Sequence, residues 1–233
     1  MDVLGQAIFD FHKGEKNLQV FQKINGEENE PIEPSYFFRA GEEMPFLERE
    51  AIKRAKGSVL DVGSGAGSHA LEVQERGLKT TACEISAPCC EVMRQRGLVD
   101  VREMPVQEIE GEKFDSILLL MNGLGMSQKL EFLTEFLARL KNLLNPGGQI
   151  IGDSSDILYW FAQADGSVLL PGDDYYGEIH FDLEYKDIRQ EFDWLFVDPA
   201  TLATYAEKAG LKIVDFVDGH HHDYLAVLEA NSR

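Results

Sequence analysis

Apolar and polar positions follow two different periods in the middle of the chain. Short apolar runs rich in strand-forming residues predict strands at 58–63, 78–85, 98–103, 114–121 and 149–153. Apolar residues at helical spacing, with caps or terminal glycines, predict helices at 42–57, 68–77, 86–97 and 127–144. This alternation predicts an α/β fold: a parallel sheet with right-handed crossovers and helices on both faces.

The pattern changes after residue 153. Polar and apolar residues alternate over 177–185 and 189–197, which predicts an antiparallel hairpin with one buried face. Asp198 followed by Pro199 is typical of a helix start, so we expect a helix that ends at Gly210. Two further strands, joined by the short segment "GHHHD", must pair antiparallel.

The first 41 residues are polar and show no regular period. The stretch "NGEENEPIEPS" contains two prolines and four glutamates, which predicts a loop. We therefore expect an N-terminal cap or lid segment over 1–41 and a main domain over 42–233, with an insertion at about 154–197.

Composition limits which partners and which cellular compartment we expect for the protein. The net charge of −19 would repel phosphate backbones, which disfavours a nucleic-acid substrate. The chain has neither a signal-peptide pattern at its start nor an apolar run of the ~20 residues that a membrane helix needs, so we expect no membrane partner. The three cysteines, Cys83, Cys89 and Cys90, are odd in number and two are adjacent, which favours a reducing cytoplasm over disulfides.

A glycine turn follows the first predicted strand of the alternating region, in "VLDVGSGAGSHA" at 59–70. Such a turn lets a ligand approach the backbone closely. A phosphate-binding loop would need a lysine after the last glycine, and here Ser68 and His69 follow Gly67. A dinucleotide fingerprint is met only in the relaxed form "GAGSHA", which starts too far beyond the strand.

A combination of three features resembles the class I S-adenosylmethionine (SAM)-dependent methyltransferases. These are "VLDVGSGAG", an acidic residue (Glu84) at the end of the next strand, and "LKNLLNPGGQII", and the resemblance covers about residues 57–230. It implies a Rossmann-like, doubly wound seven-stranded mixed sheet with an antiparallel last strand, to which the hairpin and the N-terminal cap segment are added.

The resemblance also implies a set of cofactor-binding residues. Asp61 would hold the ammonium of SAM, Glu84 the ribose hydroxyls, and Glu103 the adenine amino group, with Met104 over the ring; Gln107 or Glu108 are alternatives to Glu103. The full set for SAM, or its product S-adenosyl-L-homocysteine (SAH), is Asp61, Gly63, Ser64, Gly65, Gly67, Glu84, Ile85, Glu103, Met104, Met121 and Asn122.

The acceptor side is less well defined by the sequence. Candidate substrate residues are Tyr36, Phe37, Arg39 and Gly123, with Arg39 an alternative partner for the SAM carboxylate. No nucleophile motif is present, and the candidates for a general base are His180 and Asp153. We expect no metal site, because the three consecutive histidines at 220–222 point in different directions.

These features predict a cytoplasmic enzyme that transfers a methyl group from SAM to a small molecule. The alternatives are a protein of the same fold that binds SAM or SAH without turnover, an NAD(P)-dependent oxidoreductase based on "GAGSHA", and a transferase of another part of the SAM-derived ligand. The acceptor atom stays open, and the hairpin could either cover the active site or extend a sheet across a homodimer.

Overall fold

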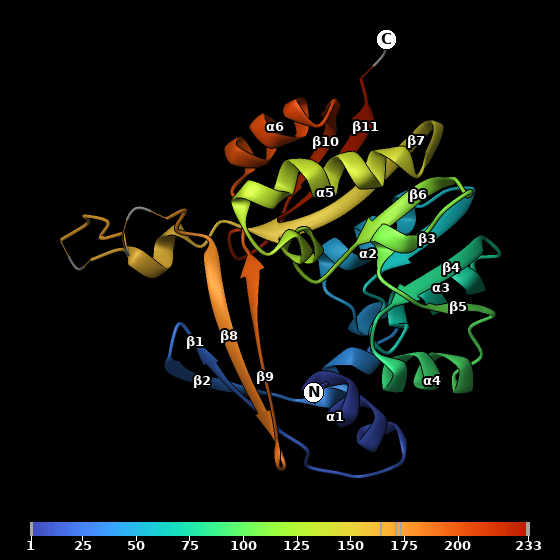
Figure 1. Cartoon of the computed structure of the whole chain (residues 1–233), viewed down its shortest axis with the longest axis horizontal. Helices are drawn as coiled ribbons and strands as arrows, with labels where there is room; N and C mark the ends of the chain where they lie inside the picture. Colours follow the sequence, from blue (N-terminus) through green and yellow to red (C-terminus); the bar gives the residue numbers. More distant parts are fainter. Residues whose placement is uncertain (1, 164, 171, 173, 232–233) are drawn as a thin grey trace.

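The computed structural model describes residues 2–163, 165–170, 172 and 174–231, and it contains two β-sheets (Figure 1). The larger sheet has seven strands in the order β10-β11-β7-β6-β3-β4-β5. Their bounds are β3 Ser58–Val62, β4 Lys79–Glu84, β5 Asp100–Glu103, β6 Phe114–Leu119, β7 Leu144–Ser155, β10 Leu211–Asp218 and β11 Asp223–Ala230. Strands β3 to β7 pair parallel, and β11 pairs antiparallel with β7 and β10. The predicted seven-stranded mixed sheet with an antiparallel last strand is confirmed.

Helices cover both faces of the large sheet, as the alternating pattern predicts. They are α2 Phe46–Arg54, α3 Ser68–Glu75, α4 Ala87–Gln95, α5 Leu130–Asn142 and α6 Pro199–Lys208. Leucines and Phe136 of α5 pack with α6 against one face, while α2 and α3 pack against the other. Side chains cap two of these helices: the Ser86 hydroxyl accepts the Cys89 N–H at the start of α4, and Asp198, as predicted, accepts two N–H groups of α6.

The expectation of an irregular segment over residues 1–41 is wrong. This segment forms α1 Val3–His12, β1 Val20–Ile24, β2 Glu27–Ile32 and a short 3₁₀ helix at Pro34–Phe38. The stretch expected to be a loop, 25–35, contains β2, although the first four of its six residues are exposed. Tertiary pairing supplies what local propensity does not, because β1 lies between β2 and the inserted hairpin.

The inserted hairpin is confirmed and consists of β8 Glu178–Tyr185 and β9 Ile188–Leu195. It pairs through β8 with β1, which gives a second, four-stranded antiparallel sheet in the order β2-β1-β8-β9. Helix α1 packs against α4 and against this small sheet (Figure 1). Segments from the start of the chain and from the insertion therefore join above the carboxyl ends of the parallel strands.

Candidate active site

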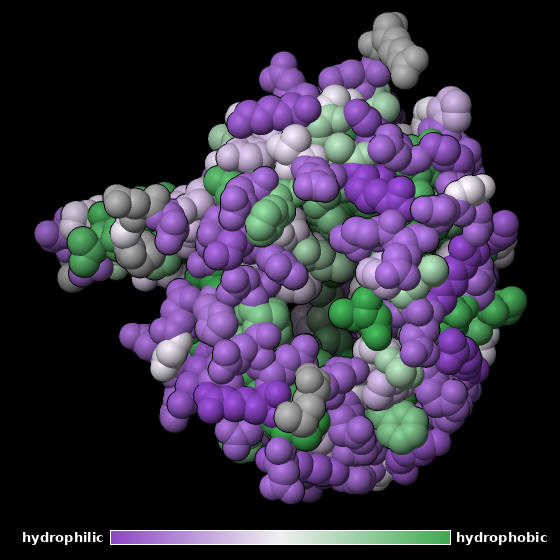
Figure 2. All heavy atoms as spheres, viewed as in Figure 1, coloured by the Kyte–Doolittle hydropathy of each residue, from purple (hydrophilic) through white to green (hydrophobic). Residues whose placement is uncertain are grey.

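A cavity of about 960 Å³ lies between the carboxyl ends of β3, β4 and β6, helix α1 and the small sheet. Figure 2 shows a hollow near the middle of the viewed face. Ligands of open α/β sheets bind at this edge of the sheet, so the cavity is where the glycine turn predicts a site. The expected residues that line it are Asp61, Gly63, Ser64, Gly65, Glu84, Ile85, Met104, Met121, Asn122, Tyr36, Phe37, Arg39 and Gly123.

Gly65 is the glycine of the turn that opens most directly onto this cavity. Its φ is +54°, and a Cβ built on it would have only Phe37 within 4 Å, at 3.9 Å. Gly67 serves a different purpose, because a Cβ there would lie 2.7 Å from Met93 Cγ in helix α4. Gly67 does not line the cavity, so its absent side chain allows helix packing rather than ligand approach.

Asp61 lies at the end of β3 and is almost fully buried, with 1% of its surface exposed. Its Oδ2 atom has no hydrogen-bond partner among the described residues. Burial raises the pKa of Asp61 to about 6, with a smaller raising effect from Glu84, while His69 acts in the opposite direction. An unpartnered buried carboxylate is costly unless a cationic group meets it, so Asp61 is suited to a ligand cation.

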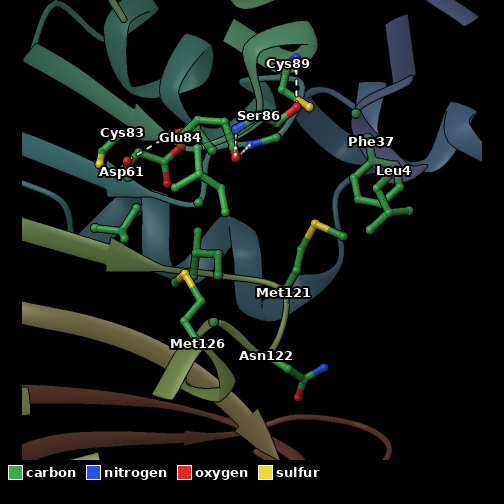
Figure 3. Close-up of a pocket in the computed structure, with 18 of the residues that line it drawn as sticks. Leu4, Phe37, Asp61, Cys83, Glu84, Ser86, Cys89, Met121, Asn122 and Met126 are labelled. Carbon is green, nitrogen blue, oxygen red and sulfur yellow. Dashed lines mark hydrogen bonds between the residues drawn. The ribbon is translucent and has the colours of Figure 1, made fainter. Parts of the chain in front are cut away.

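Glu84 at the end of β4 is fixed by two backbone hydrogen bonds. Its Oε2 accepts the N–H of Gly65 at 2.9 Å, and its Oε1 accepts the N–H of Ser86 at 2.9 Å. Figure 3 shows the Asp61 and Glu84 side chains on one side of the pocket, with Met121 and Met126 opposite them. Each carboxylate oxygen keeps a further lone pair, so Glu84 can still accept two ligand hydroxyls.

A buried ionic network borders the same cavity. The Arg39 Nη2 donates to both carboxylate oxygens of Glu48, at 2.7 and 3.0 Å, and His69 Nε2 lies 2.8 Å from Glu48 Oε2. Burial lowers the pKa of His69, but the hydrogen bond to Glu48 and the charges of Asp61, Glu48 and Asp153 together outweigh this effect and raise it overall. Arg39 Nε and Nη1 have no hydrogen-bond partner among the described residues, and the guanidinium carbon lies 3.3 Å from the ring centre of Tyr36.

No functional role was predicted from the sequence for Glu48 or His69. Both line the cavity, together with Asp2, Leu4, Gly5 and Ile8 of the N-terminal segment. For Glu48 the sequence offered no signal, because a charged residue on an amphipathic helix is usually exposed. For α1 a signal existed in "VLGQAIFDFH", whose apolar residues recur at helical spacing.

The two candidates for a general base lie outside the cavity lining. His180 is directly opposite Asp193 in the hairpin, and its Nδ1 lies 2.8 Å from Asp193 Oδ1 on the face opposite to Phe181 and Phe192. Asp153 is buried, and one of its oxygens accepts the N–H of Gly123 at 3.1 Å. Burial raises the pKa of Asp153 to about 7.

The end of β5 also differs in detail from the expectation. Glu103 is exposed and does not line the cavity, whereas Met104 and Gln107 do. Strand β5 ends at Glu103, and Met104 lies in the bend that follows it at the edge of the cavity. Glu108, the other alternative, is exposed as well.

An aromatic wall formed by the hairpin closes the cavity on the side of the small sheet. The rings of Phe181 and Phe192 stack at 5.4 Å, and Trp194 meets Phe192 edge-on at 5.9 Å. These three residues and Phe196 line the cavity. The polar residues at the strand ends and the aromatic wall thus line one continuous space.

The described residues contain neither a metal-binding cluster nor a membrane-spanning helix. No group of three His, Cys, Asp or Glu residues in the described ranges is arranged to hold a metal ion. His220 packs against Phe46, and His222 stacks on Tyr159 at 4.6 Å. Among the helices of the described part, none combines the length and the apolar character needed to cross a bilayer.

Comparison with known proteins agrees with this geometry. A family model described as a methyltransferase domain matches residues 59–148. The structure of a SAM-dependent methyltransferase from Bacteroides fragilis, in complex with SAH, is 41% identical with a TM-score of 0.91, over 99% of this chain and 95% of that chain. The CcbJ methyltransferase from Streptomyces caelestis is 16% identical with a TM-score of 0.62, over 81% and 91% of the two chains. A comparison with curated protein sequences gives no match.

The fold and the cavity thus define a class I, Rossmann-like methyltransferase. The 41% identity over nearly the whole chain shows that the protein belongs to the SAM-dependent methyltransferases. The oxidoreductase alternative is therefore not favoured.

Proposed function

We propose that the cavity binds SAM and SAH, and that the chain transfers the methyl group of SAM to a small-molecule acceptor. The observation that carries this proposal is a pair of oppositely charged groups beside the open glycine turn. Asp61 Oδ2 and the Nε and Nη1 atoms of Arg39 lack hydrogen-bond partners among the described residues, and both side chains line the cavity. A ligand with an ammonium and a carboxylate, like the amino acid part of SAM, satisfies both.

The remaining cofactor-side residues fit the adenosyl part. Glu84 is oriented by Gly65 and Ser86 to accept the ribose hydroxyls. Met104 and Gln107, which follow strand β5, line the cavity and are suited to contact the adenine ring. We propose these two residues in place of Glu103, because Glu103 does not line the cavity.

The acceptor would occupy the part of the cavity next to the aromatic wall. SAM carries its methyl group on a sulfonium, which is an activated leaving group. The contribution of the chain is therefore to align the two reactants and to keep water out. A cavity of about 960 Å³ is at the upper end of the range for small-molecule sites, which supports a small acceptor held beside the cofactor.

Four further statements stay proposals of the same kind. The net charge of −19 supports an acceptor other than a nucleic acid. The three free, buried cysteines support a cytoplasmic location. The domain division at residue 41 and a homodimer remain predictions. The N-terminal segment forms one sheet with the insertion.

Isothermal titration calorimetry tests the cofactor site with SAM, SAH and NADH in parallel. We expect micromolar binding of SAM and SAH and none of NADH. Gly65→Val should lower the SAH affinity at least tenfold, because its side chain would enter the cavity. Gly147→Val is the matched control, since Gly147 also has a positive φ (+75°) but faces open space far from the cavity. Equal SAH binding by the two variants would refute the placement of the site.

A further inference from the structure

The loop that follows β6 has an unusual backbone. Met121 and Asn122 are consecutive non-glycine residues in the left-handed region, with φ of 64° and 57°. Side chains rarely adopt this conformation, and it persists only where the surroundings impose it. Both residues line the cavity on the side opposite Glu84 (Figure 3).

Trp194 of the inserted hairpin is one of the groups that impose this conformation. Its indole Nε1–H donates to the backbone carbonyl of Asn122 at 3.0 Å, and the N–H of Gly125 donates to the same oxygen at 2.9 Å. A Cβ on Gly125 would overlap Trp194 Nε1, so only glycine at this position allows the indole to reach the loop. The close fit of Gly125 supports this hydrogen bond independently of its distance.

Strand β7 holds the other side of the same loop. The Ser155 hydroxyl donates to Asn122 Oδ1 at 2.8 Å, and Asp153 accepts the N–H of Gly123. The contacts from β7 lie within the large sheet, whereas the contact from Trp194 comes from the small sheet. Trp194 is therefore a direct link between the aromatic wall and the cofactor side of the cavity.

We propose that Trp194 is a positioning residue that fixes Met121 and Asn122 for the bound cofactor and so ties the aromatic wall to cofactor binding. This inference rests on the proposed function, namely that SAM or SAH occupies this cavity. The indole of Trp194 packs edge-on against Phe192, so a shift of the loop would also move the aromatic wall that faces the acceptor. Cofactor binding thereby sets the shape of the acceptor compartment.

The first test removes the indole N–H and keeps an apolar ring. Trp194→Phe should weaken SAH binding about three- to tenfold, which corresponds to the loss of one hydrogen bond. Trp160→Phe is the matched control: Trp160 is 42% exposed and lies outside the cavity lining, so its SAH affinity should equal that of the wild type. Calorimetry gives both affinities, and circular dichroism checks that the variants fold.

A second measurement does not depend on the folding of Trp194→Phe. The chain contains two tryptophans, so in Trp160→Phe the tryptophan fluorescence comes from Trp194 alone. We expect SAH to shift the emission of Trp194 with the same dissociation constant that calorimetry gives. Since Trp194 lines the cavity and contacts the loop, an emission unchanged by SAH would show that cofactor binding does not reach the indole.

The outcomes separate the inference from the proposed function. If the wild type does not bind SAH, the proposed function fails and the inference fails with it. If the wild type binds SAH but Trp194→Phe binds equally well, or the Trp194 emission does not respond in Trp160→Phe, the inference alone is overturned.

Discussion

Neighbouring residues at the ends of β4 and β5 have opposite surroundings. Glu84 and Glu103 are paired in register across the two strands. The Glu84 carboxylate is held by two backbone N–H groups at the cavity, and burial raises its pKa, with the backbone hydrogen bonds acting in the opposite direction. Glu103 is exposed. Glu103 is therefore a suitable control for a substitution of Glu84.

Glu84→Ala should weaken SAH binding roughly tenfold, because two charge-assisted hydrogen bonds to the ribose would be lost while the backbone donors become solvated. Glu103→Ala should leave the affinity within twofold of the wild type. Calorimetric titration with SAH measures both. A larger loss in Glu103→Ala than in Glu84→Ala would restore Glu103 as the adenine-binding acid.

Asp153 gives a prediction about pH and stability. Burial raises its pKa from 3.8 to about 7, so between these values the unfolded chain releases a proton that the folded chain keeps. The stability that the protonated group contributes is complete below pH 4 and is lost as the pH rises through about 7. Asp153→Asn keeps the acceptor for the Gly123 N–H and removes the charge.

Asp153→Asn should therefore raise the free energy of unfolding by roughly 1–3 kcal/mol at pH 8 and change it little at pH 4. Urea denaturation at the two pH values measures this difference. A gain in stability that is the same at both pH values would contradict the assignment.

At the scale of elements, α1 is attached to the small sheet by a buried polar contact. Asp10 Oδ2 accepts the Tyr185 hydroxyl at 3.0 Å and Lys186 Nζ at 2.6 Å. Burial raises the pKa of Asp10, but the hydrogen bonds from Lys186, Gln6 and Tyr185 together outweigh it, so the pKa is lowered overall. The carboxylate is thus charged at neutral pH and holds α1 beside the cavity that this helix lines.

Asp10→Ala should destabilise the fold by about 1–3 kcal/mol, because the Tyr185 hydroxyl would stay buried without its acceptor. Since Leu4 and Ile8 of α1 line the cavity, SAH binding should weaken as well. Glu15→Ala is the control, because its contact with Lys186 is exposed and contributes less than about 1 kcal/mol. Urea denaturation and calorimetry with SAH measure both effects, and equal behaviour of the two variants would refute the role of Asp10.

At the scale of the molecule, the cavity is closed by parts of the chain that are far apart in sequence. The glycine turn and the strand ends form its cofactor side, and α1, the segment around Tyr36 and the hairpin around Trp194 form the rest. The segment after β7 projects away from the body (Figure 1) and exposes apolar side chains such as Trp160 and Leu169. The insertion leaves the large sheet at β7 and returns to it through α6 and β10, while its hairpin, β8 and β9, belongs to the small sheet.

The sequence by itself determined the large sheet and the cofactor side of the cavity. Strand and helix periods are local signals, and the "VLDVGSGAG" turn keeps Asp61 and Gly65 next to the strand end whatever surrounds them. Glu84 follows from the same rule, because a residue at the carboxyl end of the adjacent parallel strand must lie at the same edge. These residues were predicted because chain geometry fixes them over a few positions.

Only the tertiary structure decided how the cavity is closed. Strand β2 is polar and forms because β1 offers it a pairing edge, and Glu48 is buried because Arg39 and His69 neutralise it. The link from Trp194 to Asn122 joins residues that are 72 positions apart. Such contacts depend on which surfaces meet after folding, and no period or spacing along the chain encodes that.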